Sequence, residues 1–166
     1  MNILRLFLIL FLGLGSLVNA QTSFEWIDST FEVGQKRNIQ LLQAYDGPCT
    51  VYPCYDYLDN KLTYDTLTSF LKNNPGISVS FIWHTSTAGS DEYNFHLSKK
   101  MANGLVEELI RLGIKKERVN AIGIGESCPI IKEDELQMME ESEVRFQADR
   151  KNKRIELIIT TVPNKS

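Results

Sequence analysis

The residues that could carry chemistry in this sequence are few and lie far apart along the chain. They include three cysteines, Cys49, Cys54 and Cys128, and two histidines, His84 and His96. Cys49 and Cys54 are close enough in sequence to close a small disulfide-bonded loop in an oxidising compartment, and unpaired thiols are the alternative. Because the cysteines and histidines lack the spacing of a zinc site, we predict no metal site and no cofactor.

A catalytic site is not predicted either. Enzymes need a nucleophile with a base, or a paired acid and base, brought together by recognisable motifs. No sequence feature activates the thiol of Cys128 as a nucleophile. Glu126 near Cys128, or Asp91 near Glu92, would form a site only by assumption. The sequence therefore indicates a non-catalytic protein.

The N-terminal segment has the composition of a secretory signal peptide. Arg5 gives it a positive start, Leu6 to Leu17 is almost wholly apolar, and small residues before Gln21 offer a cleavage site. The apolar run is shorter than the roughly 20 residues of a membrane-spanning helix. We expect residues 1–20 to be removed during secretion across the inner membrane. The mature chain would then have no transmembrane segment.

The remaining composition is typical of one small globular domain. The chain is 43% hydrophobic and 23% charged, with a formal net charge of -3. Nucleic acid is excluded as a partner, because binding to phosphates requires a basic patch. We expect a flexible lead at 21–30, one domain at 31–162 and a short tail at 163–166.

Hydrophobic periodicity predicts helices that alternate with strands. Thr63 is placed to cap a first helix that ends before Pro75, and Gly113 is placed to stop a second, longer helix. Strands are predicted at 77–84, 119–124 and 154–162, with one or two short strands between 31 and 43. The apolar stripe of the second helix should face the core. It comprises Tyr93, Leu97, Met101, Leu105, Leu109 and Leu112.

Two segments do not follow a regular period. Asp46 to Asp59 holds prolines, cysteines and three tyrosines, and it is interpreted as a loop. Its tyrosines either pack inside the loop or form a binding surface. Lys132 to Asp149 is rich in charge and indicates a helical excursion or a mobile flap.

The predicted fold class is α/β (α+β). The order of helices and strands predicts a two-layer sandwich, in which a mixed sheet carries its helices on one face. Strands 77–84 and 119–124 should be parallel, because a helix connects them in a crossover of the usual right-handed kind.

Four short motifs occur in a fixed order. They are HTSTAG at 84–89, YN at 93–94, LSKKMA at 97–102 and NKRIE at 152–156. This series resembles the OmpA-like domain family, whose pattern is roughly His-Thr-Asp, Tyr-Asn, Leu-Ser-x-x-Arg-Ala and Asn-Arg-Arg-Val-Glu. The resemblance covers about 31–160 and implies the same two-layer fold. Ser86 stands where the family has its aspartate, and Met101 stands where the family has its helix arginine. The chain is therefore identified as a divergent member.

The resemblance implies binding of the diaminopimelate side chain in the stem peptide of peptidoglycan. In the family, the aspartate meets the amine of this ligand and the arginine clamps its carboxylate. The residues whose positions match the binding motif, and which are the candidate ligand-binding residues here, are Thr85, Ser86, Asn94, Asn152 and Arg154.

Two functions remain open at this stage. In the first, the domain binds peptidoglycan weakly or in a different pose, with Arg154 or Lys100 supplying the positive charge. In the second, it is a protein–protein interaction module of a periplasmic or outer-membrane complex, and its partner contacts the tyrosine loop or the charged flap. Both place the protein in the periplasm or at the outer membrane.

Overall fold

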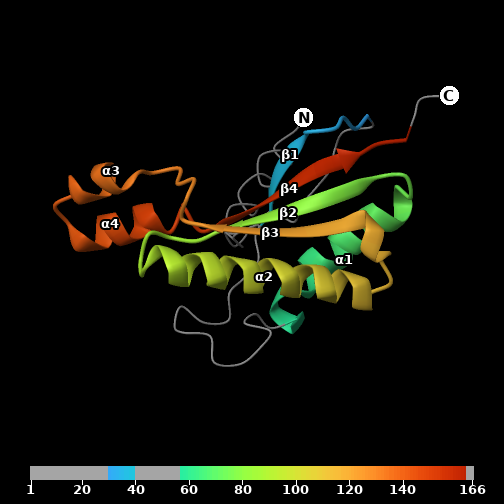
Figure 1. The fold of residues 1–166 in the computed structure, drawn as a ribbon, viewed down its shortest axis with the longest axis horizontal. Helices are drawn as coiled ribbons and strands as arrows, with labels where there is room; N and C mark the ends of the chain where they lie inside the picture. The colour runs from blue at the N-terminus through green and yellow to red at the C-terminus, as the bar shows by residue number, and fades with distance from the viewer. Residues whose placement is uncertain (1–29, 40–56, 164–166) are drawn as a thin grey trace, which may run out of the picture.

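The computed structural model describes residues 30–39 and 57–163, which build one mixed sheet flanked by helices (Figure 1). The sheet has four strands in the order β1-β4-β2-β3. Strands β2 and β3 are parallel, whereas β4 is antiparallel to both β2 and β1. The strands are β1 (Lys36–Ile39), β2 (Ser78–His84), β3 (Val119–Gly125) and β4 (Arg154–Thr161).

Two long helices, α1 (Tyr57–Asn73) and α2 (Asp91–Arg111), lie on the same face of the sheet (Figure 1). Their apolar residues form one buried cluster with alternate residues of the strands, such as Phe81 of β2 and Leu157 of β4. The predicted two-layer sandwich with helices on one face is thus confirmed, as is the parallel crossover from β2 to β3.

Two short helices, α3 (Glu133–Gln137) and α4 (Ser142–Asp149), project beyond one end of the sheet (Figure 1). They occupy the charge-rich segment for which the sequence predicted an excursion. A single 3-10 turn, η1 (Lys116–Arg118), leads into β3. Among the described residues, no helix is both long and apolar enough to cross a membrane.

Two details of the predicted helices are wrong. Thr63 does not cap α1 but lies inside it, and the helix begins at Tyr57, within the segment interpreted as a loop. The helix extends upstream because no proline or glycine interrupts the chain between Pro53 and Pro75. Tyr93 was expected in the core stripe of α2, yet it is 48% exposed because it lies in the first turn, beyond the edge of the core.

The remaining part of the apolar stripe in α2 faces the core as predicted. Met101, Leu105 and Leu109 are buried, and Leu97 and Leu112 are partly buried against them. Ser90 caps the N-terminus of α2, and its hydroxyl accepts a 3.2 Å hydrogen bond from the backbone N–H of Tyr93.

The closest packing between layers is the contact of α2 with the carboxyl end of β3. A Cβ atom on Gly123 would lie 2.1 Å from the backbone nitrogen of Lys99, so only glycine fits there. Two residues later, the backbone N–H of Gly125 donates a 2.8 Å hydrogen bond to the buried hydroxyl of Ser98. The helix backbone therefore rests directly on the strand, and this contact fixes the start of α2 relative to the ends of β2 and β3.

We predict that Gly123→Ala destabilises the fold by about 3 kcal/mol, because the helix would have to move away from the strand to admit a methyl group. Denaturant unfolding measures the difference. The control is Gly34→Ala, where the added Cβ meets nothing within 4 Å. The only cost there is the backbone strain of alanine at a φ of 88°, about 1 kcal/mol. Equal costs at the two positions would contradict the close-packing argument.

Candidate functional site

Most of the sequence-predicted ligand residues lie at one end of the sheet, around the segment that joins β2 to α2. This segment, residues 85–90, is called the 85–90 loop below. The beginning of α2, the end of β3, the beginning of β4 and the end of α4 all contact it or lie beside it. The polar side chains at this end of the sheet form two groups, one around the loop and one around Glu156.

Asn94 anchors the 85–90 loop from the first turns of α2. Its buried side-chain nitrogen donates to the backbone oxygens of Ser86 (3.3 Å) and Ala88 (3.1 Å), and also to the carboxylate of Glu126. The structure thus brings the side chain of Asn94 against the backbone of Ser86. The amide nitrogen of Asn94 therefore holds the 85–90 loop in shape.

Glu126 follows β3 and lies half-buried beside Asn94. Burial raises the pKa of its carboxyl group, and the nearby carboxylates of Asp91 and Glu133 raise it further, while the hydrogen bond from Asn94 opposes this shift. The loop therefore lies next to a group of acidic side chains. Sequence reasoning had considered Glu126 only as a partner for Cys128 and had given it no role in ligand binding.

Thr85 and Ser86 begin the loop. The backbone N–H of Thr85 donates a 3.0 Å hydrogen bond to Gly125, which continues the pairing of β2 with β3. The Thr85 hydroxyl is buried, and the described part of the chain offers it no hydrogen-bond partner. Ser86 is half-buried, so its side chain stands at the boundary between the loop and solvent.

Asn152 lies at the turn before β4 and is fully buried. Its side-chain oxygen accepts hydrogen bonds from the backbone N–H groups of Ile130 (2.8 Å) and Ile131 (2.9 Å). Its side-chain nitrogen donates to the backbone oxygen of Ile131 (2.9 Å) and to the carboxylate of Asp149 (3.1 Å). Every polar atom of this amide is engaged, so Asn152 joins the two ends of the α3–α4 excursion.

Arg154 lies at the start of β4, paired across the sheet with His84. Its side chain is 14% exposed, and two of its nitrogens lie 2.9 Å from one carboxylate oxygen of Glu156. It also donates to the backbone oxygens of Asn152 (3.3 Å) and Cys128 (3.2 Å). The guanidinium is thus committed to internal partners rather than directed toward the loop.

Glu156 is the centre of this second polar group. Besides Arg154, it lies 3.3 Å from the Nε2 atom of His84 and 3.5 Å from the Nζ atom of Lys36 on β1. Burial alone would raise the pKa of Glu156, but Arg154, His84 and Lys36 outweigh it and lower the pKa below the ordinary value. The carboxylate therefore holds three strands together at this end of the sheet.

His84 is 3% exposed. Burial lowers its pKa, and the positive charges of Arg154 and Lys36 lower it further, whereas Glu156 and the backbone of Cys128 oppose the shift. Neither ring nitrogen makes a well-aligned hydrogen bond within the described residues, so the contact with Glu156 is electrostatic. His84 is a structural residue at the end of β2.

Met101 is 4% exposed and belongs to the hydrophobic core. An arginine introduced at this position would have to bury its charge among apolar side chains or displace the helix. Cys128 is exposed and not disulfide-bonded, while Cys49 and Cys54, the predicted bridge, lie outside the described residues. In the described ranges, no three potential ligands are grouped to hold a metal ion.

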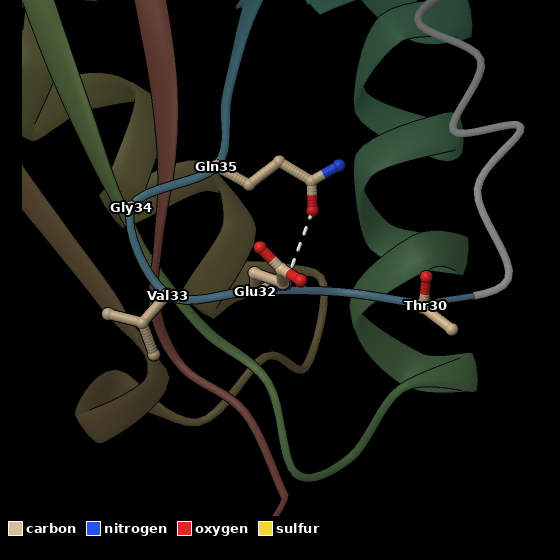
Figure 2. Close-up of a pocket in the computed structure, with 5 residues that line it drawn as sticks. All are labelled: Thr30, Glu32, Val33, Gly34 and Gln35. Atoms are coloured by element: carbon tan, nitrogen blue, oxygen red, sulfur yellow. Dashed lines mark hydrogen bonds between the residues drawn. The ribbon is translucent and has the colours of Figure 1, made fainter.

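A surface hollow lies just before β1, and Figure 2 shows the residues that line it. Its lining comes from residues 30–35, where the backbone N–H of Glu32 donates a 3.3 Å hydrogen bond to the side chain of Gln35. Gly34 and Gln35 pair with Ile159, close to the far end of β4 from Arg154. The hollow contains none of the predicted ligand residues.

We predict that Asn152→Ala lowers stability by about 2 kcal/mol, because it removes a buried amide whose side chain makes hydrogen bonds to the backbone of Ile130 and Ile131. Chemical denaturation measures this loss. Lys151→Ala, an exposed neighbouring substitution, should cost less than about 0.5 kcal/mol. A stable Asn152→Ala protein would contradict the structural role given to this amide.

We also predict that the protein loses stability as the pH falls below 6.5, the ordinary pKa of histidine. Because the folded state lowers the pKa of His84, the unfolded state binds more protons there as the pH falls and is favoured in acid. The lowered pKa of Glu156 adds a further loss below 4.5. Unfolding measured from pH 7.5 to 5 should show a flatter dependence for His84→Gln, with His96→Gln as the control. An unchanged slope in His84→Gln would contradict the assignment.

No family model matches the chain, but curated proteins resemble part of it. It is 31% identical over 98 residues to outer membrane porin F of Pseudomonas fluorescens, a match that covers 59% of this chain and 29% of the porin. It is 40% identical over 65 residues to outer membrane porin F of Pseudomonas aeruginosa, which covers 39% and 19%. The match to outer membrane protein A of Citrobacter freundii is 43% over 53 residues, which covers 32% and 22%. The chain thus matches less than a third of each relative.

Solved structures share the fold at low sequence identity. The peptidoglycan-associated lipoprotein from Burkholderia pseudomallei superposes with a TM-score of 0.52 at 19% identity, over 68% of this chain and 86% of that protein. The periplasmic domain of Helicobacter pylori MotB gives a TM-score of 0.58 at 15% identity, over 82% and 79%. The local sequence matches and the shared fold agree with the four ordered motifs, and this chain is similar to the OmpA-like domain family.

Proposed function

We propose that this protein is a non-catalytic domain of the cell envelope that binds peptidoglycan at the 85–90 loop, with weakened or altered recognition of diaminopimelate. The observation that carries the proposal is the loop held by Asn94 at the carboxyl end of β2, with Ser86 at its boundary to solvent. The name of one structural neighbour, a peptidoglycan-associated lipoprotein, supports this ligand class.

The altered recognition follows from three side chains. Ser86 offers a neutral hydroxyl where the resembling family has an aspartate, so the amine of diaminopimelate gains no ionic partner there. Met101 is buried in the core and offers nothing to a carboxylate. Arg154 already pairs with Glu156. Loss of one member of a desolvated charge pair typically costs about 2 to 5 kcal/mol.

A second candidate function is a protein–protein interaction module, and the α3–α4 projection favours it. Met138 is 81% exposed, and Val144 and Phe146 of α4 are also exposed. Helices that project from a small domain and carry apolar side chains in solvent are typical of a contact surface. This function needs no wall binding and would leave the 85–90 loop unused.

Both functions require that the chain reaches the envelope. Secretion across the inner membrane through the N-terminal segment, with residence in the periplasm or at the outer membrane, is part of the proposal. The named neighbours include a periplasmic domain and the named relatives are outer-membrane proteins, which supports this location.

We predict that Ser86→Asp strengthens binding to purified peptidoglycan sacculi about tenfold, because a carboxylate adds a charge-assisted hydrogen bond to the amine. Co-sedimentation of the protein with sacculi at several concentrations measures the affinity. Met101 is left unchanged, since an arginine in the core would test folding instead of binding.

The matched control is Thr160→Asp, which adds the same charge at an exposed position near the opposite end of β4 and should leave binding unchanged. A wild-type protein that does not sediment with sacculi, and does not gain binding from Ser86→Asp, would overturn peptidoglycan recognition. Sedimentation of wild type and Ser86→Asp with equal affinity would overturn the weakening attributed to Ser86.

A further inference from the structure

We propose that Asp149 supplies the negative charge of the ligand site, in place of a carboxylate at position 86, and that the site recognises a primary ammonium group. This inference rests on the proposed function at the same loop. It differs from the sequence motif because Asp149 comes from the end of α4, more than 60 positions further along the chain than Ser86.

The geometry of Asp149 carries the inference. Its Oδ1 atom accepts a 2.9 Å hydrogen bond from the backbone N–H of Thr87 and a 3.1 Å hydrogen bond from the side chain of Asn152. These two bonds hold the carboxylate against the 85–90 loop, one residue beyond Ser86. The Oδ2 atom accepts no hydrogen bond from the described residues, and Asp149 is half-buried, so this oxygen remains available to a ligand.

A second observation concerns the loop itself. The Thr85 hydroxyl, two residues from the N–H group that Asp149 binds, is buried and has no hydrogen-bond partner in the described residues. A buried hydroxyl without a partner costs free energy that a ligand or an ordered water can recover. Thr85 therefore provides a neutral hydrogen-bonding group in the same loop that the carboxylate of Asp149 contacts.

The charge balance at the loop favours a cation. Asp149 lies on one side of the loop, and Glu126 lies against Asn94, which also binds the loop. Arg154 does not offset these charges, because Glu156 neutralises it. An ammonium group carries three donors and suits such a site.

The ligand class follows from what the helix lacks. Met101 is buried and stands where the resembling family has the arginine that binds the side-chain carboxylate of diaminopimelate. A site that holds the amine but has no partner at position 101 should discriminate little between a diaminopimelate side chain and a lysine side chain, which lacks the additional carboxylate. The recognised group is thus the side-chain amine of a stem peptide that contains either diaminopimelate or lysine.

The test uses Asp149→Asn in the full-length mature protein. Asparagine keeps an oxygen that can accept the bonds from Thr87 and Asn152, so the substitution removes the charge with little change in shape. Binding to sacculi should weaken on the order of tenfold, as expected for one hydrogen bond to a charged group. Asp134→Asn on α3 is the control for a charge change on the projection and should bind as the wild type does.

Two further measurements separate recognition from structural support. The double variant Ser86→Asp with Asp149→Asn should recover wild-type binding, which a purely structural role of Asp149 does not predict. Soluble tripeptides L-Ala-γ-D-Glu-L-Lys and L-Ala-γ-D-Glu-diaminopimelate should displace the wild type from sacculi at concentrations that agree within about threefold.

The outcomes distinguish this inference from the proposed function. If Asp149→Asn binds sacculi as tightly as the wild type does, the role of Asp149 is overturned while the proposed function stands. The same conclusion follows if Asp149→Asn binds more weakly and the double variant does not recover wild-type affinity. A tenfold preference for the diaminopimelate peptide overturns the ligand class. Sedimentation of Ser86→Asp but not of the wild type overturns the role of Asp149, because the wild type would then lack the charge. If neither protein sediments with sacculi, the proposed function is overturned and the inference fails with it.

Discussion

The direct contact between the backbones of α2 and β3 is the constraint on which the rest of the site depends. Gly123 leaves no room for a side chain beneath Lys99, and the Ser98 hydroxyl ties the helix to Gly125. This contact sets the height of the first turns of α2 above the sheet. Asn94 lies one turn before Ser98, so the same contact places its amide within reach of the 85–90 loop and of Glu126.

Two groups of polar side chains at this end of the sheet have different roles. Glu156 with Arg154, His84 and Lys36 joins β4 to both neighbouring strands, and all of its members except Lys36 are largely buried. This group is structural, and it uses the one motif arginine that the resemblance offered as a ligand-binding cation. The group around the 85–90 loop, in contrast, leaves a carboxylate oxygen of Asp149 and a hydroxyl of Thr85 without internal partners. The unpartnered polar atoms of this group are what the proposed ligand site rests on.

How much of the site could be predicted depended on whether a residue acts through local or distant contacts. The stripe in α2 correctly placed Met101 in the core, because helical periodicity is a local property. The four motifs correctly indicated the fold, whereas the ligand-binding roles of Ser86 and Asn94 stay predictions. The motifs identified Asn152 as a candidate ligand-binding residue, but its structural role could not be predicted, because its hydrogen-bond partners lie about twenty residues upstream. The contact of Asp149 with the 85–90 loop could not be predicted from the sequence. Asp149 lies in a charge-rich segment, and no local pattern distinguishes its carboxylate from the others there.

The sequence by itself determined the order of helices and strands, the mixed two-layer sheet, the core face of α2 and the resemblance to the OmpA-like domain family. These follow from periodicity, glycine positions and short motifs, which act between neighbours along the chain. Only the tertiary structure decided which charges meet. Arg154 is engaged by Glu156, and Asp149 reaches the loop that lacks an acidic residue of its own. The physical reason is that an ion pair or hydrogen bond depends on distances of a few ångströms between groups far apart in sequence, and packing alone sets those distances.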